Sequence, residues 1–219
     1  MSGLFRSAQD PISSESHAFG AFLSLLGGFL LILRGFQVGA SLTDLAGSFL
    51  FVLSLIALYA ASAIYHYYPG TATSGGIKRR LRKLDHSMIY LLIAGSYTPF
   101  SLKFLPAEKG TRFCGILWII AFVGMLLKLL WINAPRWLTS LLYLCMGWAI
   151  LFVIDDFSSC GAPCFSMVAL GGIFYTVGAV IYALKRPNFS DRFGFHELFH
   201  LFILAGSISH YLAVFFFVL

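Results

Sequence analysis

Residues 194–217 read GFHELFHLFILAGSISHYLAVFFF, a mostly apolar stretch with two histidines four positions apart near its start. A helix that crosses a membrane needs about 20 predominantly apolar residues, so this stretch is long enough to span a bilayer. Positions i and i+4 of a helix share a face, which places His196 and His200 side by side. Polar groups are costly inside a membrane and usually have a function there, so this pair is the most informative feature of the chain.

The rest of the chain has the same apolar character. Of its 219 residues, 59% are hydrophobic and 11% are charged, and the mean hydropathy is +0.85. A soluble domain carries about 25% charged residues, so this chain could not cover a surface that faces water. The composition predicts a protein that crosses the membrane several times, with the lipid bilayer as its partner. The net charge of +6 comes mainly from predicted loops, where it sets orientation, so we infer no nucleic-acid partner.

Seven stretches are apolar and long enough to be membrane spans. They cover approximately residues 17–35, 43–67, 84–105, 113–132, 137–155, 164–185 and 194–217. Short linkers separate them, so no separate soluble domain is expected. We therefore predict an all-α integral membrane protein in which residues 17–219 form a single seven-transmembrane-helix bundle, preceded by a cytoplasmic N-terminal segment of residues 1–16.

The distribution of basic residues predicts the orientation of this bundle. The N-terminus and the loops after spans two, four and six hold ten Lys and Arg residues, whereas the opposite loops hold four. Basic residues are enriched on the cytoplasmic side of membrane proteins. We therefore expect the N-terminus in the cytoplasm and, with an odd number of spans, the C-terminus outside.

Three spans bring polar side chains to one predicted depth. The second span ends at the cytoplasmic face, and the third and seventh spans begin there. Each of the three carries a histidine or an acid within two turns of that face. These residues are Ser62, His66, Asp85, His196 and His200.

Three imidazoles with one open position are typical of a catalytic zinc site. Zinc lowers the pKa of water in the open position towards neutrality. Asp85 could orient and deprotonate that water. Ser62 shares a helix face with His66 and could bond to His66, to the water or to a developing oxyanion.

The same residues allow a different interpretation. HELFH matches the H-E-x-x-H pattern of zinc proteases, in which the glutamate is the general base. An intramembrane metalloprotease would use Glu197 in this role, with Asp85 as the third ligand. This alternative leaves His66 and Ser62 without a function.

A wider set of motifs resembles a known family. The chain is similar to bacterial hemolysin III proteins, within the progestin and adipoQ receptor family, and the similarity covers nearly the whole chain. The matching stretches are ESHAFG, SAIYH, KLDHSMIYLLIAGSYTPF, YLCMGW, GGIFYTVGAVIYALKRP and HELFHLFILAGSISHY. The resemblance implies seven helices with the N-terminus inside, in agreement with the loop charges, and a bacterial inner (plasma) membrane as the location.

The resemblance also implies a set of site residues. The family's three zinc-binding histidines correspond to His66, His196 and His200. Its Ser-x-x-x-His motif corresponds to Ser62 and His66, and its aspartate, which contacts water at the zinc, to Asp85. The wider superfamily includes alkaline ceramidases, which hydrolyse a lipid amide at a similar site.

Two further functional hypotheses stand beside the metalloprotease. The first is a zinc-dependent hydrolase of a lipid amide or ester that enters from the inner leaflet. The second is a non-enzymatic membrane regulator, receptor-like protein or hemolysin in which zinc is a structural clamp. The sequence defines no oligomeric state.

Several other residues carry weaker expectations. His86 is predicted to lie at the interface or beside the metal ligands, and His210 to bond between helices. His17 is expected to contribute to capping and charge placement at the start of the first span, with a place beside the metal ligands as the alternative. Cys160 and Cys164 share a short loop and could form a disulfide in an oxidising compartment.

Overall fold

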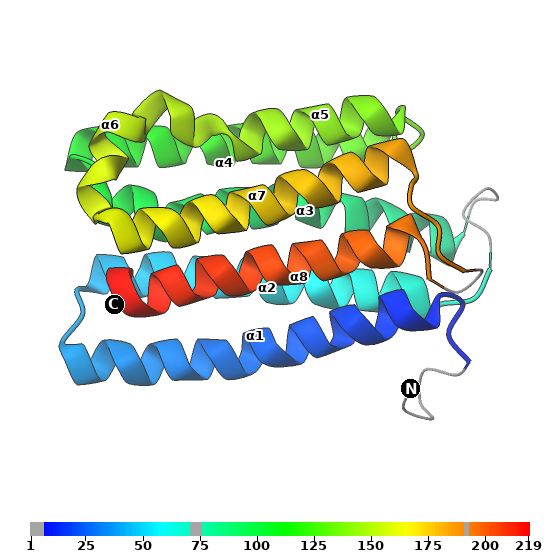
Figure 1. Cartoon of the computed structure of the whole chain (residues 1–219), viewed down its shortest axis with the longest axis horizontal. Helices are drawn as coiled ribbons and strands as arrows, with labels where there is room; N and C mark the ends of the chain where they lie inside the picture. The colour runs from blue at the N-terminus through cyan, green and yellow to red at the C-terminus, as the bar shows by residue number, and fades with distance from the viewer. Residues whose placement is uncertain (1–6, 71–75, 191–192) are drawn as a thin grey trace.

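Seven membrane-length helical segments form one bundle (Figure 1). The computed structural model describes residues 7–70, 76–190 and 193–219. The segments are α1 (Pro11–Val38), α2 (Leu42–Tyr67), α3 (Ile77–Phe104), α4 (Ala107–Leu130), α5 (Arg136–Gly147) with its continuation, α7 (Ala162–Leu184) and α8 (Phe195–Ala213). The predicted all-α seven-helix bundle is therefore confirmed.

Three helices begin at least six residues before their predicted starts, namely α1, α3 and α4, the last of which begins at Ala107 where the prediction had residue 113. The first helix begins at Pro11, so the last six residues of the predicted N-terminal segment belong to α1. Proline suits the first turn of a helix because its missing N–H would have no partner there. The third helix begins at Ile77, seven residues early, and takes in the basic cluster of residues 78–83. Two of the basic residues counted for orientation, Arg6 and Arg192, lie outside the described residues.

The fifth segment is not one continuous α-helix. After α5 the chain passes through a 3₁₀ turn (Ala149–Val153), a short helix α6 (Ile154–Phe157) and a second 3₁₀ turn (Ser158–Cys160). Cys160 and Cys164 are free thiols in this structure.

Six of the seven segments are apolar and long enough to cross a membrane by length and composition alone. The exception is α3, whose first two turns carry the basic cluster. Lys78 within that cluster donates hydrogen bonds to the carbonyls of Tyr65 and Tyr68, at 2.5 and 2.6 Å. A cation at the carboxyl end of a helix is favourable, so this contact holds the end of α2 against the start of α3.

Small and polar residues face the inside of the bundle. On α1 the buried residues recur every three or four positions and are nearly all serine, glycine or histidine. Large apolar residues such as Phe29, Ile119 and Phe152 are exposed instead. Because lipid tails are as apolar as a protein core, membrane helices associate through small residues that allow close packing. The exposed apolar surface therefore faces lipid.

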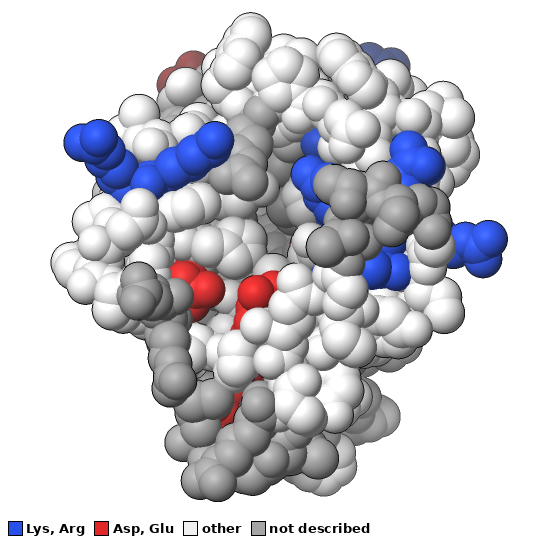
Figure 2. All heavy atoms as spheres, turned by 90° about the vertical axis from the view of Figure 1, so that its right-hand side faces the viewer, with Lys and Arg blue, Asp and Glu red and all other residues white. Residues whose placement is uncertain are grey.

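The start of α1 and the C-terminal end of the chain lie at opposite ends of the bundle (Figure 1), as an odd number of spans requires. Figure 2 shows the end at which α2 ends and α8 begins. This end is hollowed near its centre, with acidic side chains beside the hollow and basic side chains to either side. The side of the membrane that it faces stays a prediction, with the basic residues favouring the cytoplasm.

Close packing of α2 on α3 gives a first prediction. A Cβ atom at Gly95 would lie 2.2 Å from the Ser54 hydroxyl oxygen and 2.5 Å from its Cβ, whereas one at Gly172 would have nothing within 4 Å. Overpacking of a tight interface costs about 1–3 kcal/mol. We expect Gly95→Ala to lower the melting temperature in detergent and Gly172→Ala to leave it unchanged or slightly higher. Equal melting temperatures for the two variants would contradict this packing.

Candidate metal site

Three histidines from two helices converge at the hollowed end of the bundle. His66 comes from the last turn of α2, and His196 and His200 from the first two turns of α8. Each offers one ring nitrogen, and these three atoms lie within 4.8 Å of one another. The Nε2 atoms of His66 and His196 are only 3.2 Å apart. The convergence predicted from the sequence is therefore present.

The nitrogen positions fit a small divalent cation. Tetrahedral zinc with bonds of about 2.0–2.1 Å places two ligand nitrogens about 3.3 Å apart, which matches the His66–His196 pair. Two imidazole nitrogens can approach this closely only if one donates a proton or a cation lies between them. Within the described residues, this is the one group of three metal-ligating side chains.

Asp10 fixes the ring of His66. Its carboxylate oxygen Oδ2 lies 2.9 Å from Nδ1 of His66, and its backbone N–H donates to the carbonyl of His66 at 3.1 Å. The hydrogen bond with His66 lowers the pKa of the Asp10 carboxyl, so this group is ionised at neutral pH. A carboxylate only accepts, so the proton lies on Nδ1 and the lone pair of Nε2 faces the other histidines. Carboxylate–histidine pairs of this kind orient metal ligands.

His17 orients a second ring. It is buried, and its imidazole stacks on that of His200 with ring centroids 3.8 Å apart and an interplanar angle of 20°. Tyr59 packs against the His17 ring in an edge-on arrangement, with centroids 5.0 Å apart. This position fits the alternative expected for His17, a place beside the metal ligands, better than capping at the start of the span.

The contribution of α1 has a signal in the sequence that hydropathy alone does not detect. Asp10, Ser13, Ser14 and His17 follow the i, i+3, i+4, i+7 pattern of one helix face at the start of an apolar stretch. Asp10 was missed because the predicted span began at His17, which left the acid in a loop.

Asp85 lies beside the histidine cluster without belonging to it. Its Oδ2 is 3.2 Å from Nδ1 of His86, the next residue, and its carboxylate also accepts a hydrogen bond from Ser62. Ser62 therefore bonds to the acid, a partner not among those predicted from the sequence. Nδ1 of His86 also lies 2.9 Å from the carbonyl oxygen of Arg82, one turn earlier on α3, and His86 lines the same cavity as His196 and His200.

Glu197, the acid of the HELFH motif, has a structural role at the start of α8. Its Oε2 accepts the backbone N–H of Gly194 at 2.9 Å, and its Oε1 accepts the Ser13 hydroxyl at 3.2 Å. These bonds cap α8 and tie it to α1. Both oxygens are thus engaged in hydrogen bonds that hold the start of α8.

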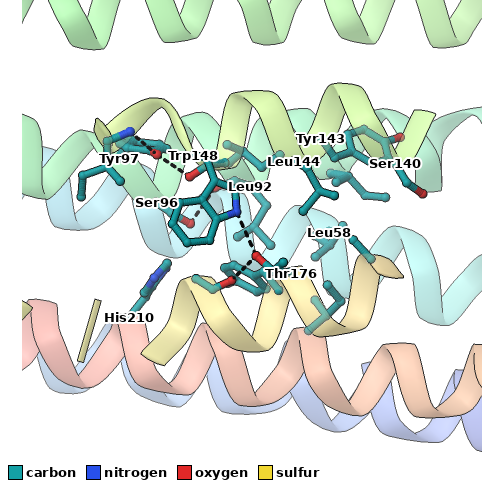
Figure 3. A pocket seen from close by; sticks show the side chains of 18 of the residues that line it. Leu58, Leu92, Ser96, Tyr97, Ser140, Tyr143, Leu144, Trp148, Thr176 and His210 are labelled. Carbon is teal, nitrogen blue, oxygen red and sulfur yellow. Dashed lines mark hydrogen bonds between the residues drawn. The ribbon is translucent and has the colours of Figure 1, made fainter. Parts of the chain in front are cut away.

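A cavity of about 280 Å³ opens from the site into the bundle. Asp85, Ser62, His196 and His200 line one part of it, and the remaining wall is largely apolar. Figure 3 shows part of this wall, where Trp148 Nε1 of the fifth segment donates to Thr176 Oγ1 of α7 at 3.0 Å.

His210 lies at the far part of the same cavity. Its Nε2 is 3.1 Å from the carbonyl of Val168 on α7, as expected for a histidine that bonds between helices.

These features define a class of protein, a helical membrane protein with several spans and a candidate three-histidine metal site that opens onto an internal cavity. The profile described as haemolysin-III related matches residues 5–211, and the chain belongs to this family. The resemblance inferred from the motifs is therefore confirmed.

Relatives are found in bacteria and animals. The Hemolysin-3 homolog of Bacillus subtilis (strain 168) is 31% identical over 98% of this chain and 96% of the relative. Hemolysin-3 of Bacillus cereus is 32% identical over 93% of this chain and 89% of the relative. The Adiponectin receptor protein of Drosophila melanogaster is 29% identical over 61% of this chain and 34% of its own length.

The Asp10–His66 pair gives a second prediction. Removal of a carboxylate that orients a metal ligand typically weakens metal affinity by about 10- to 100-fold. We expect Asp10→Ala to weaken Zn²⁺ binding by this factor in competition with a chelator of known affinity. The Asp10 side chain makes no capping hydrogen bond to α1, so the helix itself should be little affected. Asp155→Ala, at an exposed acid in α6, is the control. Equal zinc affinity for the two variants would contradict a role of Asp10.

Proposed function

We propose that this protein is a zinc-dependent membrane hydrolase that cleaves an amide or ester bond of a lipid. The proposal rests on one observation above all, that two of the three clustered histidines line the same cavity as a buried acid, Asp85. Zinc is favoured as the metal because it accepts three nitrogen ligands and needs no redox chemistry.

His66, His196 and His200 would hold the metal, with Asp10 keeping the His66 ring in the required tautomer. Zinc at this site would supply Lewis acidity, which polarises a carbonyl group and acidifies water. The protein residues would handle the protons. Asp85 would accept a proton from the attacking water and then pass it to the leaving group.

The neighbours of Asp85 support this role. Ser62 donates a hydrogen bond to its carboxylate, and His86 lies 3.2 Å from the same group. Such contacts fix the direction in which the remaining lone pairs of the acid point. Ser62 would thus act as a positioning residue for Asp85.

The composition of the cavity wall favours a lipid as the substrate. The wall is mostly apolar, and the site lies at the end of the bundle that is expected to face the cytoplasm. An acyl chain could occupy the apolar part while its amide or ester carbonyl lies near the histidines. We place the protein in the inner (plasma) membrane, with substrate entering from the inner leaflet.

The two alternatives are less well supported. A purely structural zinc clamp would need no cavity at the metal site and no acid beside it. In an intramembrane protease of the H-E-x-x-H type Glu197 would serve as general base, whereas both of its oxygens cap α8 and bond to α1.

Substitution of Asp85 gives a third prediction. A general acid–base group contributes about 10²- to 10⁴-fold to rate. We expect Asp85→Asn to keep stoichiometric zinc and a normal melting temperature and to lose turnover by such a factor. The assay is release of fatty acid from a panel of ceramides, other N-acyl lipids and acyl esters, followed by mass spectrometry.

Glu197→Gln is the matched control, because it replaces the acid of the HELFH motif with its isosteric amide. The hydrolase proposal expects turnover to persist in this variant. If wild-type protein with full zinc cleaved nothing in the panel and its overproduction left cellular lipids unchanged, the proposal would fail. Loss of activity in Glu197→Gln alone would favour the protease.

A further inference from the structure

A buried lysine in the wall of the cavity has no acidic partner. Lys128, near the end of α4, is only 5% exposed, and its ammonium group donates to the hydroxyl of Thr139 at 2.9 Å. It forms no ion pair within the described residues. An ammonium group has three donors, so two remain for another group. Buried charges are normally paired, because removing an unpaired charge from water is unfavourable.

A second cation lines the same cavity as Lys128. It is Arg82 of α3. Arg82 also forms no ion pair in the part of the chain that the structure describes. The acid one turn further along α3 is Asp85, which lies against His86 instead. Two unpaired cations in one cavity wall leave a local excess of positive charge.

Hydroxyl groups complete this part of the wall. Thr139, the hydrogen-bond partner of Lys128, and its neighbour Ser140 lie at the start of α5, line the cavity and are each 4% exposed. Figure 3 shows Ser140 and Tyr143 together at the end of the cavity opposite His210. Arg82, Lys128 and Ser140 therefore combine a planar guanidinium, an ammonium and a hydroxyl, which together suit an anion with several oxygens.

We propose that Arg82, Lys128 and Ser140 form a binding site for the phosphate of an anionic membrane lipid. A phosphate offers more acceptor oxygens and more charge than a carboxylate, which suits two cations with free donors. A lipid is favoured over a free anion because the cavity continues from these residues into an apolar space lined by Leu92, Ile93 and Leu144, among others. The inference concerns binding and does not depend on hydrolysis or on zinc.

The position of this site has a consequence for substrate choice, which does rest on the proposed function. Arg82 and Asp85 are three positions apart on α3, so their side chains leave the same face about one turn apart. A lipid phosphate held by Arg82 would therefore lie next to the acid that we assign to catalysis. Substrates with a phosphate close to the scissile bond would be preferred.

The test is binding of defined lipids to delipidated protein in detergent, followed by thermal shift and native mass spectrometry. The probes are phosphatidylglycerol, phosphatidylcholine and inorganic phosphate. For wild type we expect phosphatidylglycerol to bind at least about tenfold more tightly than phosphatidylcholine, since each lost charge-assisted hydrogen bond costs about this factor or more. Inorganic phosphate alone should produce no comparable stabilisation.

Two variants and one control separate this site from its surroundings. Lys128→Met keeps the length of the side chain without its charge, and Arg82→Gln removes the second cation. Each should reduce the preference for phosphatidylglycerol by about tenfold. Arg80→Gln, which removes an exposed charge from the same helix, should leave it unchanged. Without lipid, the Lys128→Met variant should have a melting temperature no lower than that of wild type, because the buried charge is removed. A lower melting temperature would indicate that Lys128 stabilises the fold and would contradict its role in lipid binding.

The His200→Ala variant distinguishes a failure of the lipid-binding proposal from a failure of the metal-site proposal. His200→Ala should lose zinc and keep the lipid preference, because His200 is not among the anion-binding residues. Equal binding of the two lipids by wild type, or an unchanged preference in both cation variants, would overturn the proposal. Stabilisation by inorganic phosphate as strong as that by lipid would overturn the assignment to a lipid.

Discussion

Nε2 of His66 and Nε2 of His196 lie 3.2 Å apart, where the end of α2 meets the start of α8. The candidate metal site depends on the closeness of these two nitrogens. It requires α2 to end and α8 to begin at the same depth, and both helices are held there by α1. Asp10 bonds to the ring and the backbone carbonyl of His66, and Ser13 bonds to Glu197 at the start of α8. The first helix thus fixes the relative heights of the two helices that supply the three imidazoles.

Packing in a membrane explains how so many polar groups can be buried together. Small residues on the inner face of α1 let its neighbours approach, while large apolar side chains cover the outside. In this arrangement a buried polar group must find a partner inside the bundle, since lipid offers none. Asp85 has Ser62 and His86, and His210 has a carbonyl on α7. This demand is only partly met at His200 and at its stacking partner His17, whose buried ring nitrogens include atoms without a hydrogen-bond partner among the described residues. Lys128, whose ammonium has a single hydroxyl partner, is another such place.

Much of this structure could be predicted from the sequence, since length and hydropathy define membrane helices almost by themselves. The convergence of His66, His196 and His200 followed from counting spans and placing each histidine by depth. Asp10 could not be placed in this way, because hydropathy does not detect the polar first turn of a helix. The bend after Gly147 was also missed, since a 3₁₀ turn in an apolar stretch leaves no mark on composition. The hydrogen bond from Lys128 to Thr139 depends on how α4 lies against α5, which the sequence of α4 alone does not reveal.

The most direct test of the metal site is to measure the zinc content of the purified protein together with its His66→Ala and His200→Ala variants. We predict close to one zinc per wild-type chain and a loss of most of that zinc in each folded variant. Wild-type protein without a stoichiometric transition metal, or folded variants that keep their zinc, would contradict the claim that these imidazoles bind a metal ion.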